Sequence, residues 1–153
     1  MIGFLKCLAY LAVLSTASFV LGRLMPKSVF KYDRFPNKPF AFEKDGRIYT
    51  KIGVRKWKSK LPDISKIFSY IMPSKCLPEK VTSANIKTML KETCVAEWIH
   101  KLLAVFGFVC ARIWRGTGGI TVSVLYAVIN IMYIIIQRYN RPKLVAVLQS
   151  LPC

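Results

Sequence analysis

Residues 118–136 read GGITVSVLYAVINIMYIII, an uncharged run rich in β-branched and aromatic residues. A helix needs about 20 mainly apolar residues to cross the hydrocarbon core of a bilayer. The run has this length, and Tyr133 stands near its end, where aromatic residues anchor a span at the interface. We therefore predict a transmembrane helix over 118–136, which points to a membrane protein.

A second apolar block lies at the amino terminus. Residues 7–22 carry no charge, and with Ile2–Leu5 the block reaches the length of a span, while Lys6 can extend its ammonium group to the interface. The block is followed by a basic and then two bulky residues, which do not resemble a cleavage site. We predict an uncleaved anchor helix over 1–22, with a signal peptide as the alternative.

The third apolar block, 102–111, is short. It spans a membrane only if its helix extends over 97–114, and the alternative is an interfacial or re-entrant segment. If it spans, 97–136 form a helical hairpin whose tight turn lies at Gly116–Gly119.

Composition limits the class of protein. The chain has 153 residues, of which 54% are hydrophobic, and 24 Lys and Arg against 7 Asp and Glu give a net charge of +17. This length excludes two-domain enzymes, Rossmann dehydrogenases and kinases. Beside apolar blocks, the excess positive charge favours an anionic lipid surface as partner, and no fold that recognises nucleic acid is visible.

The basic residues also predict orientation. Three spans place 21 of the 24 Lys and Arg on one face and 3 on the other. By the positive-inside tendency, the basic region 23–96 and the tail 137–153 are cytoplasmic and the amino terminus is outside. We expect a multi-pass protein of the cell membrane.

Region 23–96 is interrupted by six prolines, so we expect an interfacial loop with little regular structure. A turn at Lys44–Arg47 followed by a short strand at Ile48–Ile52 is the main exception. A helix should begin near Thr82 or Ser83 and continue into the block at 102–111. The expected fold class is an all-α membrane protein with an anchor helix, a basic loop and a carboxy-terminal hairpin.

The only histidine of the chain lies among carboxylates. At about 100° per residue, Glu92, His100 and Glu97 share one helix face within an arc of about 140°. A histidine oriented by a carboxylate can take a proton from a hydroxyl and return it, which makes His100 a candidate general base. Alternatively, Glu97 neutralises Lys101 four residues later and His100 is solvated. A nucleophilic Cys94 with His100 is a further alternative.

Two polar clusters are candidate binding residues. Beyond the span, Arg138 and Arg141 offer planar groups that bind phosphate or carboxylate, and Pro142 predicts that the helix ends near Arg141. Asn130, inside the span, needs a partner on another helix. The remaining candidates of these clusters are Gln137, Asn140, Arg55, Lys56, Trp57 and Lys58. The basic group at 55–58 suits lipid headgroups or the phosphates of an acyl carrier such as coenzyme A.

No metal site is expected. The five cysteines form no CxxC pair and have a single histidine for company. Cys7 and Cys110 lie within apolar blocks and are interpreted as small hydrophobic residues.

Three motifs in order carry a family resemblance: Ile52-Gly53-Val54-Arg55-Lys56-Trp57-Lys58-x-Lys60-Leu61-Pro62-Asp63, then Glu92-Thr93-x-x-Ala96-Glu97-x-x-His100, then Asn130 with Gln137-Arg138-Tyr139-Asn140-Arg141-Pro142-Lys143-Leu144. Behind an amino-terminal anchor, they resemble the glycosyl-4,4'-diaponeurosporenoate acyltransferases of staphyloxanthin-type carotenoid biosynthesis. Lys143 stands where a second arginine is expected. The resemblance covers about residues 1–144.

The resemblance implies transfer of a fatty acyl group onto a sugar hydroxyl of a membrane glycolipid, in that pathway the glucose 6-hydroxyl of a glycosylated C30 carotenoid acid. It implies an acyl donor, acyl-CoA or acyl carrier protein, as substrate and no bound cofactor. His100 is then the base, Glu97 or Glu92 orients it, and Arg138 and Arg141 bind the donor or steady the oxyanion. The alternatives are a small membrane methyltransferase of the phospholipid or isoprenylcysteine type and a non-catalytic lipid-binding assembly subunit.

Overall fold

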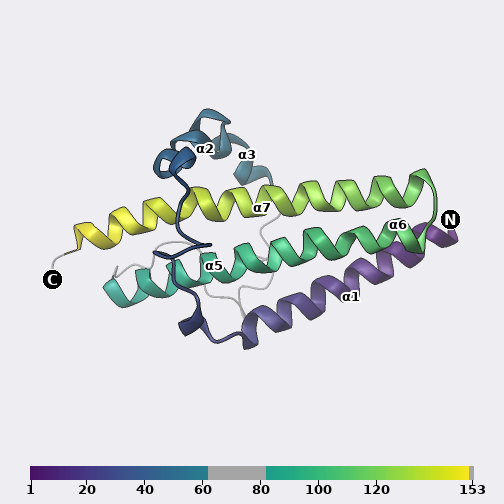
Figure 1. Ribbon diagram of the computed structural model, residues 1–153, viewed down its shortest axis with the longest axis horizontal. Helices are drawn as coiled ribbons and strands as arrows, with labels where there is room; N and C mark the ends of the chain where they lie inside the picture. Colours follow the sequence, from purple (N-terminus) through teal and green to yellow (C-terminus); the bar gives the residue numbers. More distant parts are fainter. Residues whose placement is uncertain (62–81, 152–153) are drawn as a thin grey trace. The chain divides into compact units, whose positions relative to one another are not determined.

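Helices account for the regular secondary structure of the residues that the structure describes. The computed structural model describes residues 1–61 and 82–151, apart from the side chains of Lys44 and Asp45, and no strand occurs in these ranges. Three helices are long: α1 (Ile2–Leu24), α5 (Ser83–Phe106) and α7 (Thr117–Ser150) (Figure 1). The shorter elements are η1 (Lys27–Val29), η2 (Ala41–Gly46), α2 (Arg47–Lys51), α3 (Val54–Trp57), η3 (Lys58–Lys60), η4 (Gly107–Val109) and α6 (Cys110–Ile113).

Three helical segments of the described chain are long and apolar enough to cross a membrane: Ile2–Leu24, Ser83–Ile113 and Thr117–Ser150. They contain the three apolar blocks of the sequence, and the short block at 102–111 lies inside the second of them. The three apolar helices indicate that the protein associates with a membrane.

The chain divides into two compact units. The first comprises Met1–Val29 and Val95–Ile135, and the second comprises Phe30–Cys94 and Ile136–Cys153. Both α5 and α7 therefore contribute one part to each unit.

Within the first unit, α1 runs antiparallel to α5 and α6 (Figure 1). The Tyr10 hydroxyl donates to the Phe106 carbonyl at 3.0 Å, and the Cys7 thiol donates to the Cys110 carbonyl at 3.6 Å. Gly22, further along α1, packs against Ile99, which is earlier in α5. The thiols of Cys7 and Cys110 are free and buried, which confirms that both residues act as small core side chains.

The reversal between α6 and α7 depends on close packing at glycines. Gly116 has a φ of 99°, a left-handed conformation that glycine adopts without strain. Gly118 and Gly119 are already helical and lie against Trp114, where a Cβ would overlap the Trp114 ring or backbone. The turn is therefore shorter than the predicted Gly116–Gly119, because Gly118 and Gly119 belong to α7 and pack against Trp114.

In the second unit, α5 begins where the sequence predicts. The Thr82 side chain accepts a hydrogen bond from the Asn85 backbone N–H at 3.2 Å, and α5 starts at Ser83. This cap satisfies a donor that the first turn of a helix leaves unpaired.

The predicted strand at Ile48–Ile52 is wrong. Gly46 has a left-handed φ of 88°, but the chain then forms helix α2, which buries Tyr49 and leaves Ile48 and Ile52 at the surface. A strand needs a partner strand for its backbone groups, and the described residues offer none, whereas a helix satisfies these groups internally. The expected loop 23–61 thus consists largely of short helices, while Pro62 and Asp63 of the basic motif lie outside the described residues.

The prediction that the helix ends near Arg141 is also wrong. Helix α7 continues through Pro142 to Ser150. A proline inside a helix removes one hydrogen bond and costs about 3 kcal/mol. Contacts on both sides offset this cost, because Arg141 is almost fully buried and the Pro142 ring packs against Gly46.

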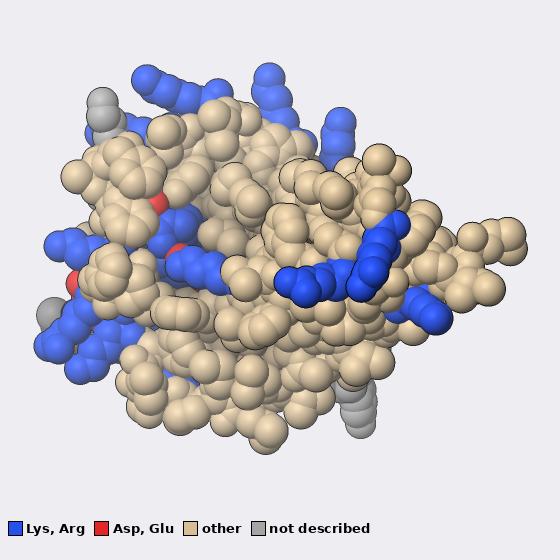
Figure 2. All heavy atoms as spheres, turned by 45° about the vertical axis from the view of Figure 1, so that its right-hand side comes forward, with Lys and Arg blue, Asp and Glu red and all other residues tan. Residues whose placement is uncertain are grey.

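The surface reflects the charge of the sequence. In Figure 2, Lys and Arg atoms project at many points of the face shown, and few Asp or Glu atoms are visible. Much of the same face is neither acidic nor basic, in agreement with the many exposed apolar side chains of the long helices.

We predict that Gly119→Ala destabilises the first unit by about 1–3 kcal/mol, because the added methyl group meets the Trp114 and Cys110 carbonyls. Thermal unfolding of the purified protein in detergent measures the change. Thr121→Ala, an exposed position two residues later, is the matched control and should leave the midpoint nearly unchanged. Equal midpoints for both variants would contradict the close packing.

Candidate functional site

The candidate base lies in the first unit, where α5 and α7 pair. The His100 Nδ1 atom lies 2.9 Å from the Asn130 Oδ1 atom. The His100 ring stacks on the Tyr133 ring, with centroids 4.8 Å apart and an interplanar angle of 9°. The prediction that Asn130 finds a partner on another helix is confirmed, and Tyr133 packs on the histidine.

The orientation of the Asn130 amide indicates which ring nitrogen of neutral His100 carries the proton. Its Nδ2 group donates to the Tyr126 carbonyl at 2.8 Å, which turns Oδ1 toward the histidine. Because a carbonyl oxygen only accepts, His100 Nδ1 must carry the proton. In the neutral ring, Nε2 is then the nitrogen that can accept a proton, as a general base requires.

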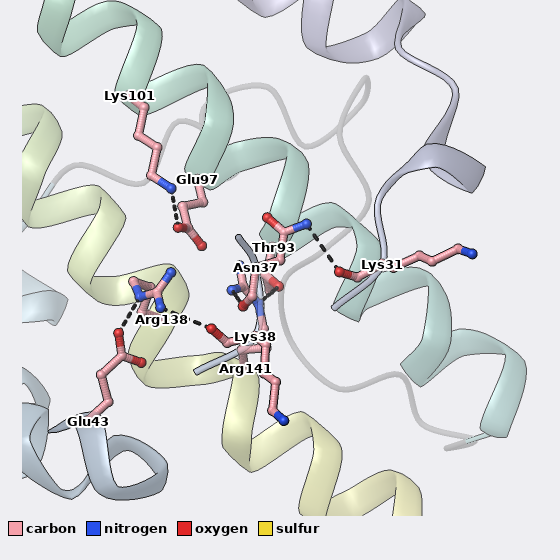
Figure 3. Close-up of polar contacts among 9 residues, drawn as sticks. All are labelled: Lys31, Asn37, Lys38, Glu43, Thr93, Glu97, Lys101, Arg138 and Arg141. Atoms are coloured by element: carbon pink, nitrogen blue, oxygen red, sulfur yellow. Dashed lines mark hydrogen bonds and ion pairs between the residues drawn. The ribbon is translucent and has the colours of Figure 1, made fainter. Parts of the chain in front are cut away.

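The predicted carboxylates have different surroundings. Glu97 is fully buried and forms an ion pair of 2.6 Å with Lys101 (Figure 3). The Lys101 ammonium also lies over the Trp98 ring. This is the i, i+4 pair that the structural interpretation of the sequence expected. Glu92 is half-buried and belongs to the second unit. Their roles toward His100 stay predictions.

A second polar cluster lies in the second unit around Arg138 (Figure 3). Its Nε group donates to Glu43 Oε1 at 2.6 Å, and its Nη2 group donates to the Lys38 carbonyl at 3.3 Å. Its guanidinium also lies 4.5 Å from the centroid of the Phe40 ring. Arg138 thus holds the segment that contains η2 against α7.

Arg141 fixes the same segment at another point. Its Nε group donates to the Thr93 hydroxyl at 3.1 Å, and its Nη1 group donates to the Asn37 carbonyl. The Asn37 amide in turn donates from Nδ2 to the Lys31 carbonyl at 3.2 Å. Both predicted arginines are therefore buried in contacts with the chain itself.

Tyr49 lies beside this cluster. Burial raises its pKa from the ordinary value of 10.0, and the negative charge of Glu43 raises it further, to about 12, although Arg138 opposes part of this shift. The neutral phenol is therefore favoured in the folded protein.

The basic group at 55–58 contacts α7 through Lys58. The Lys58 ammonium donates to Asn140 Oδ1 at 3.4 Å and lies 5.1 Å from the centroid of the Tyr139 ring. The Trp57 indole donates to the Ile52 carbonyl at 3.3 Å. Of the remaining candidates, Gln137 is buried, whereas Arg55 and Lys56 are exposed.

Sequence reasoning missed three members of these clusters, Asn37, Glu43 and Tyr49, and gave no role to Thr93 of the second motif. One signal was present, because Glu43 is one of only 7 acidic residues in a strongly basic chain. A lone carboxylate in such surroundings has many possible cationic partners, and the sequence does not select among them.

Comparisons with known proteins agree on one family. Residues 26–150 match the family model described as glycosyl-4,4'-diaponeurosporenoate acyltransferase. Proteins of that name from Staphylococcus aureus strains bovine RF122 / ET3-1, MRSA252 and N315 are each 33% identical over 150 residues, which cover 95% of this chain and 87% of the relative. No solved structure matches the chain.

We predict that neutral His100 carries its proton on Nδ1. Because the chain has a single histidine, ¹⁵N NMR of histidine-labelled protein in detergent reports this ring alone. Asn130→Leu should lose the preference for the Nδ1–H form, whereas Val128→Leu, at an exposed position on the same helix, should keep it. An Nε2–H tautomer in the unaltered protein would disprove the assignment.

We also predict a loss of stability between pH 10 and 12 that depends on Tyr49. Folding favours the neutral phenol, so the contribution of Tyr49 is complete below pH 10 and disappears as the pH rises through about 12. Tyr49→Phe should flatten the decline of the unfolding midpoint over this interval. Tyr32→Phe, in the same unit, is the control, and an identical decline in both variants would contradict the prediction.

Proposed function

Because the chain belongs to the glycosyl-4,4'-diaponeurosporenoate acyltransferase family, we propose that it transfers a fatty acyl group onto a sugar hydroxyl of a membrane glycolipid. Family membership makes the protein an acyltransferase. The three apolar helices support a membrane-bound acceptor. The single observation that carries the mechanism is the hydrogen bond between His100 and Asn130.

His100 acts as the general base in this proposal. Its Nε2 atom takes the proton of the acceptor hydroxyl while the hydroxyl oxygen attacks the acyl carbonyl of a thioester donor. The tetrahedral intermediate then expels the donor sulfur, and the imidazolium returns the proton to it. The products are an ester and a free thiol, so His100 ends the cycle neutral.

Asn130 and Tyr133 support this cycle. Asn130 keeps the proton on Nδ1 and leaves Nε2 as the base, a role that an asparagine also has beside the histidine of papain-like proteases. The Tyr133 ring fixes the plane of the imidazole and favours the cationic form by its electron-rich face. The sequence predicts that Glu97 or Glu92 orients His100, whereas we propose that Asn130 orients the ring.

The cationic residues at 55–58 are suited to bind the phosphate groups of the acyl donor. We propose that Arg55 and Lys56, which are exposed, meet the phosphates of coenzyme A or of an acyl carrier protein together with Trp57 and Lys58. Arg138 and Arg141 hold the segment that contains Asn37 and Glu43. We propose that their positive charge attracts the anionic part of the donor or stabilises the oxyanion. Gln137 and Asn140 complete this group. The donor is a substrate, and the reaction needs no bound cofactor or metal.

We further propose that the protein is a multi-pass protein of the cell membrane, with region 23–96 and the carboxy terminus on the cytoplasmic side among anionic lipids. The support is the distribution of the 24 Lys and Arg residues. Family membership disfavours the methyltransferase alternative.

Lipid mass spectrometry of cells with and without the gene tests the reaction class. A glycolipid that gains a long acyl chain when the gene is present supports the proposal. An added methyl group would support a methyltransferase, and an unchanged lipid profile would support an assembly subunit.

We predict that His100→Gln lowers the rate of acyl transfer by a factor on the order of 10² to 10⁴, because glutamine retains hydrogen bonding but cannot transfer the proton. The measurement is initial rate per folded protein, with the thiol product quantified. Val105→Ala, an exposed position on the same helix, should keep the full rate. Activity of His100→Gln near that of the unaltered enzyme would remove His100 from the mechanism.

A further inference from the structure

Two lysines of the second unit converge on one tyrosine. The Lys143 ammonium lies 3.6 Å from the centroid of the Tyr139 ring, and the Lys58 ammonium lies 5.1 Å from the same centroid. Lys143 follows Tyr139 on α7, whereas Lys58 belongs to η3, far earlier in the chain. The fold of the unit, rather than a local run of basic residues, therefore brings these two charges together.

A third cation belongs to the same cluster. Arg55, exposed on α3, lies near enough to Tyr139 to interact with its side chain electrostatically. Like charges gathered around one point repel each other. The electron-rich face of Tyr139 offsets part of this repulsion by its contact with the two ammonium groups, but a neutral ring cannot cancel their charge. The cluster stays strongly positive.

No acidic side chain compensates this charge in the part of the chain that the structure describes. There, none of Arg55, Lys58 and Lys143 forms an ion pair with a carboxylate. The Lys58 ammonium donates instead to the neutral Asn140 Oδ1 at 3.4 Å. An asparagine that accepts through its oxygen still offers the two N–H donors of its amide. Three cations and an amide together suit an anion with several oxygen acceptors.

The cluster is accessible and lies on a fixed base. Arg55 and Lys143 are exposed and Lys58 is half-buried, so a ligand can reach all three without displacing the core. The Tyr139 side chain beneath them is only 2% exposed, and Gly46 lies against the Tyr139 carbonyl. The cations thus surround a rigid ring at the surface of the unit.

The number of cations indicates the charge of the anion. A phosphate monoester carries about −1.5 to −2 charges at pH 7, and a pyrophosphate also carries more than one, whereas a phosphodiester carries a single charge. Coenzyme A contains a pyrophosphate and a 3'-phosphate. The phosphopantetheine arm of acyl carrier protein and the headgroup of phosphatidylglycerol each contain one phosphodiester. Coenzyme A therefore matches a cluster of three cations best.

We propose that Arg55, Lys58 and Lys143 bind the phosphate groups of coenzyme A, so that the acyl donor is an acyl-coenzyme A rather than an acyl carrier protein. The proposal rests on the proposed function, because it identifies the donor of the same reaction. It adds Lys143, on the platform of Tyr139, to the cationic group at 55–58 and places the phosphates between α7 and η3.

The experiment measures binding of two donors to the purified full-length protein in a neutral detergent. Decanoyl-coenzyme A carries the phosphates, and decanoyl-pantetheine carries the same thioester without them. Isothermal titration calorimetry should show decanoyl-coenzyme A binding on the order of 10-fold or more tighter to the unaltered protein. Lys58→Gln and Lys143→Gln should each weaken decanoyl-coenzyme A on the order of 10-fold, and change decanoyl-pantetheine by less than about 2-fold.

Two further variants separate this site from net charge. Lys87→Gln removes the same charge at an exposed position of α5 in the same unit, and it should bind decanoyl-coenzyme A as the unaltered protein does. Lys143→Arg keeps the charge and should lose less than about 3-fold. Equal losses in Lys87→Gln and Lys143→Gln, or equal affinity of the two donors for the unaltered protein, would overturn the proposal.

Other phosphate sources are tested with the same variants. Dioctanoylphosphatidylglycerol, a soluble lipid with one phosphodiester, should bind without dependence on Lys58 or Lys143. Binding of this lipid that depends on both lysines, without binding of decanoyl-coenzyme A, would assign the cluster to lipid headgroups. Acyl transfer from decanoyl-acyl carrier protein but not from decanoyl-coenzyme A would also refute the proposal, while it would retain the reaction.

Binding and acyl transfer to glycosyl-4,4'-diaponeurosporenoate are measured separately. Binding of decanoyl-coenzyme A that depends on Lys58 and Lys143, without acyl transfer by the unaltered protein, would retain this site and refute the proposed function. Acyl transfer from decanoyl-coenzyme A with the same KM in the unaltered protein and in both glutamine variants would do the reverse.

Discussion

The close packing at glycines of α7 against the segment that precedes it is the constraint on which the candidate base depends. Gly107, in η4, lies against the Tyr126 ring of α7, and Gly118 and Gly119 lie against Trp114, so larger residues at these positions would push α7 away from the segment that precedes it. Asn130 and Tyr133 of α7 contact His100 of α5 in this arrangement. In apolar surroundings a polar side chain needs such a partner, and the match between glycine contacts and polar contacts stabilises one arrangement.

In the second unit, charged side chains make the contacts between distant parts of the chain. Arg138 and Arg141 lie three residues apart on α7 and bind a segment about 100 residues earlier in the chain, at Glu43 and Asn37. Removing one partner of such a buried pair leaves an uncompensated charge, which is far more costly than the pair itself is stabilising. These contacts also explain why α7 continues through Pro142, because Arg141 is held on one side of the proline and Gly46 packs on the ring.

His100 and the two arginines, Arg138 and Arg141, therefore belong to different units and are held by different contacts. The first unit orients a single titratable ring between apolar helices, with an amide as its partner. The second unit holds the buried carboxylate of Glu43 beside Arg138, whose Nε group lies 2.6 Å from Glu43 Oε1.

Helix length, apolar character and the order of the motifs were determined by the sequence alone, because they depend on residues that are near one another in the chain. The three apolar helices, the Thr82 cap, the ion pair of Glu97 with Lys101 and the family follow from such local patterns. Only the tertiary structure decided that His100 meets Asn130, 30 positions away, and that Arg138 meets Glu43, 95 positions away. It also showed that the chain forms helix α2, Arg47–Lys51, where the sequence predicts a strand over Ile48–Ile52. Periodicity shows which residues share a face of one element, but the partner of that face depends on packing between elements.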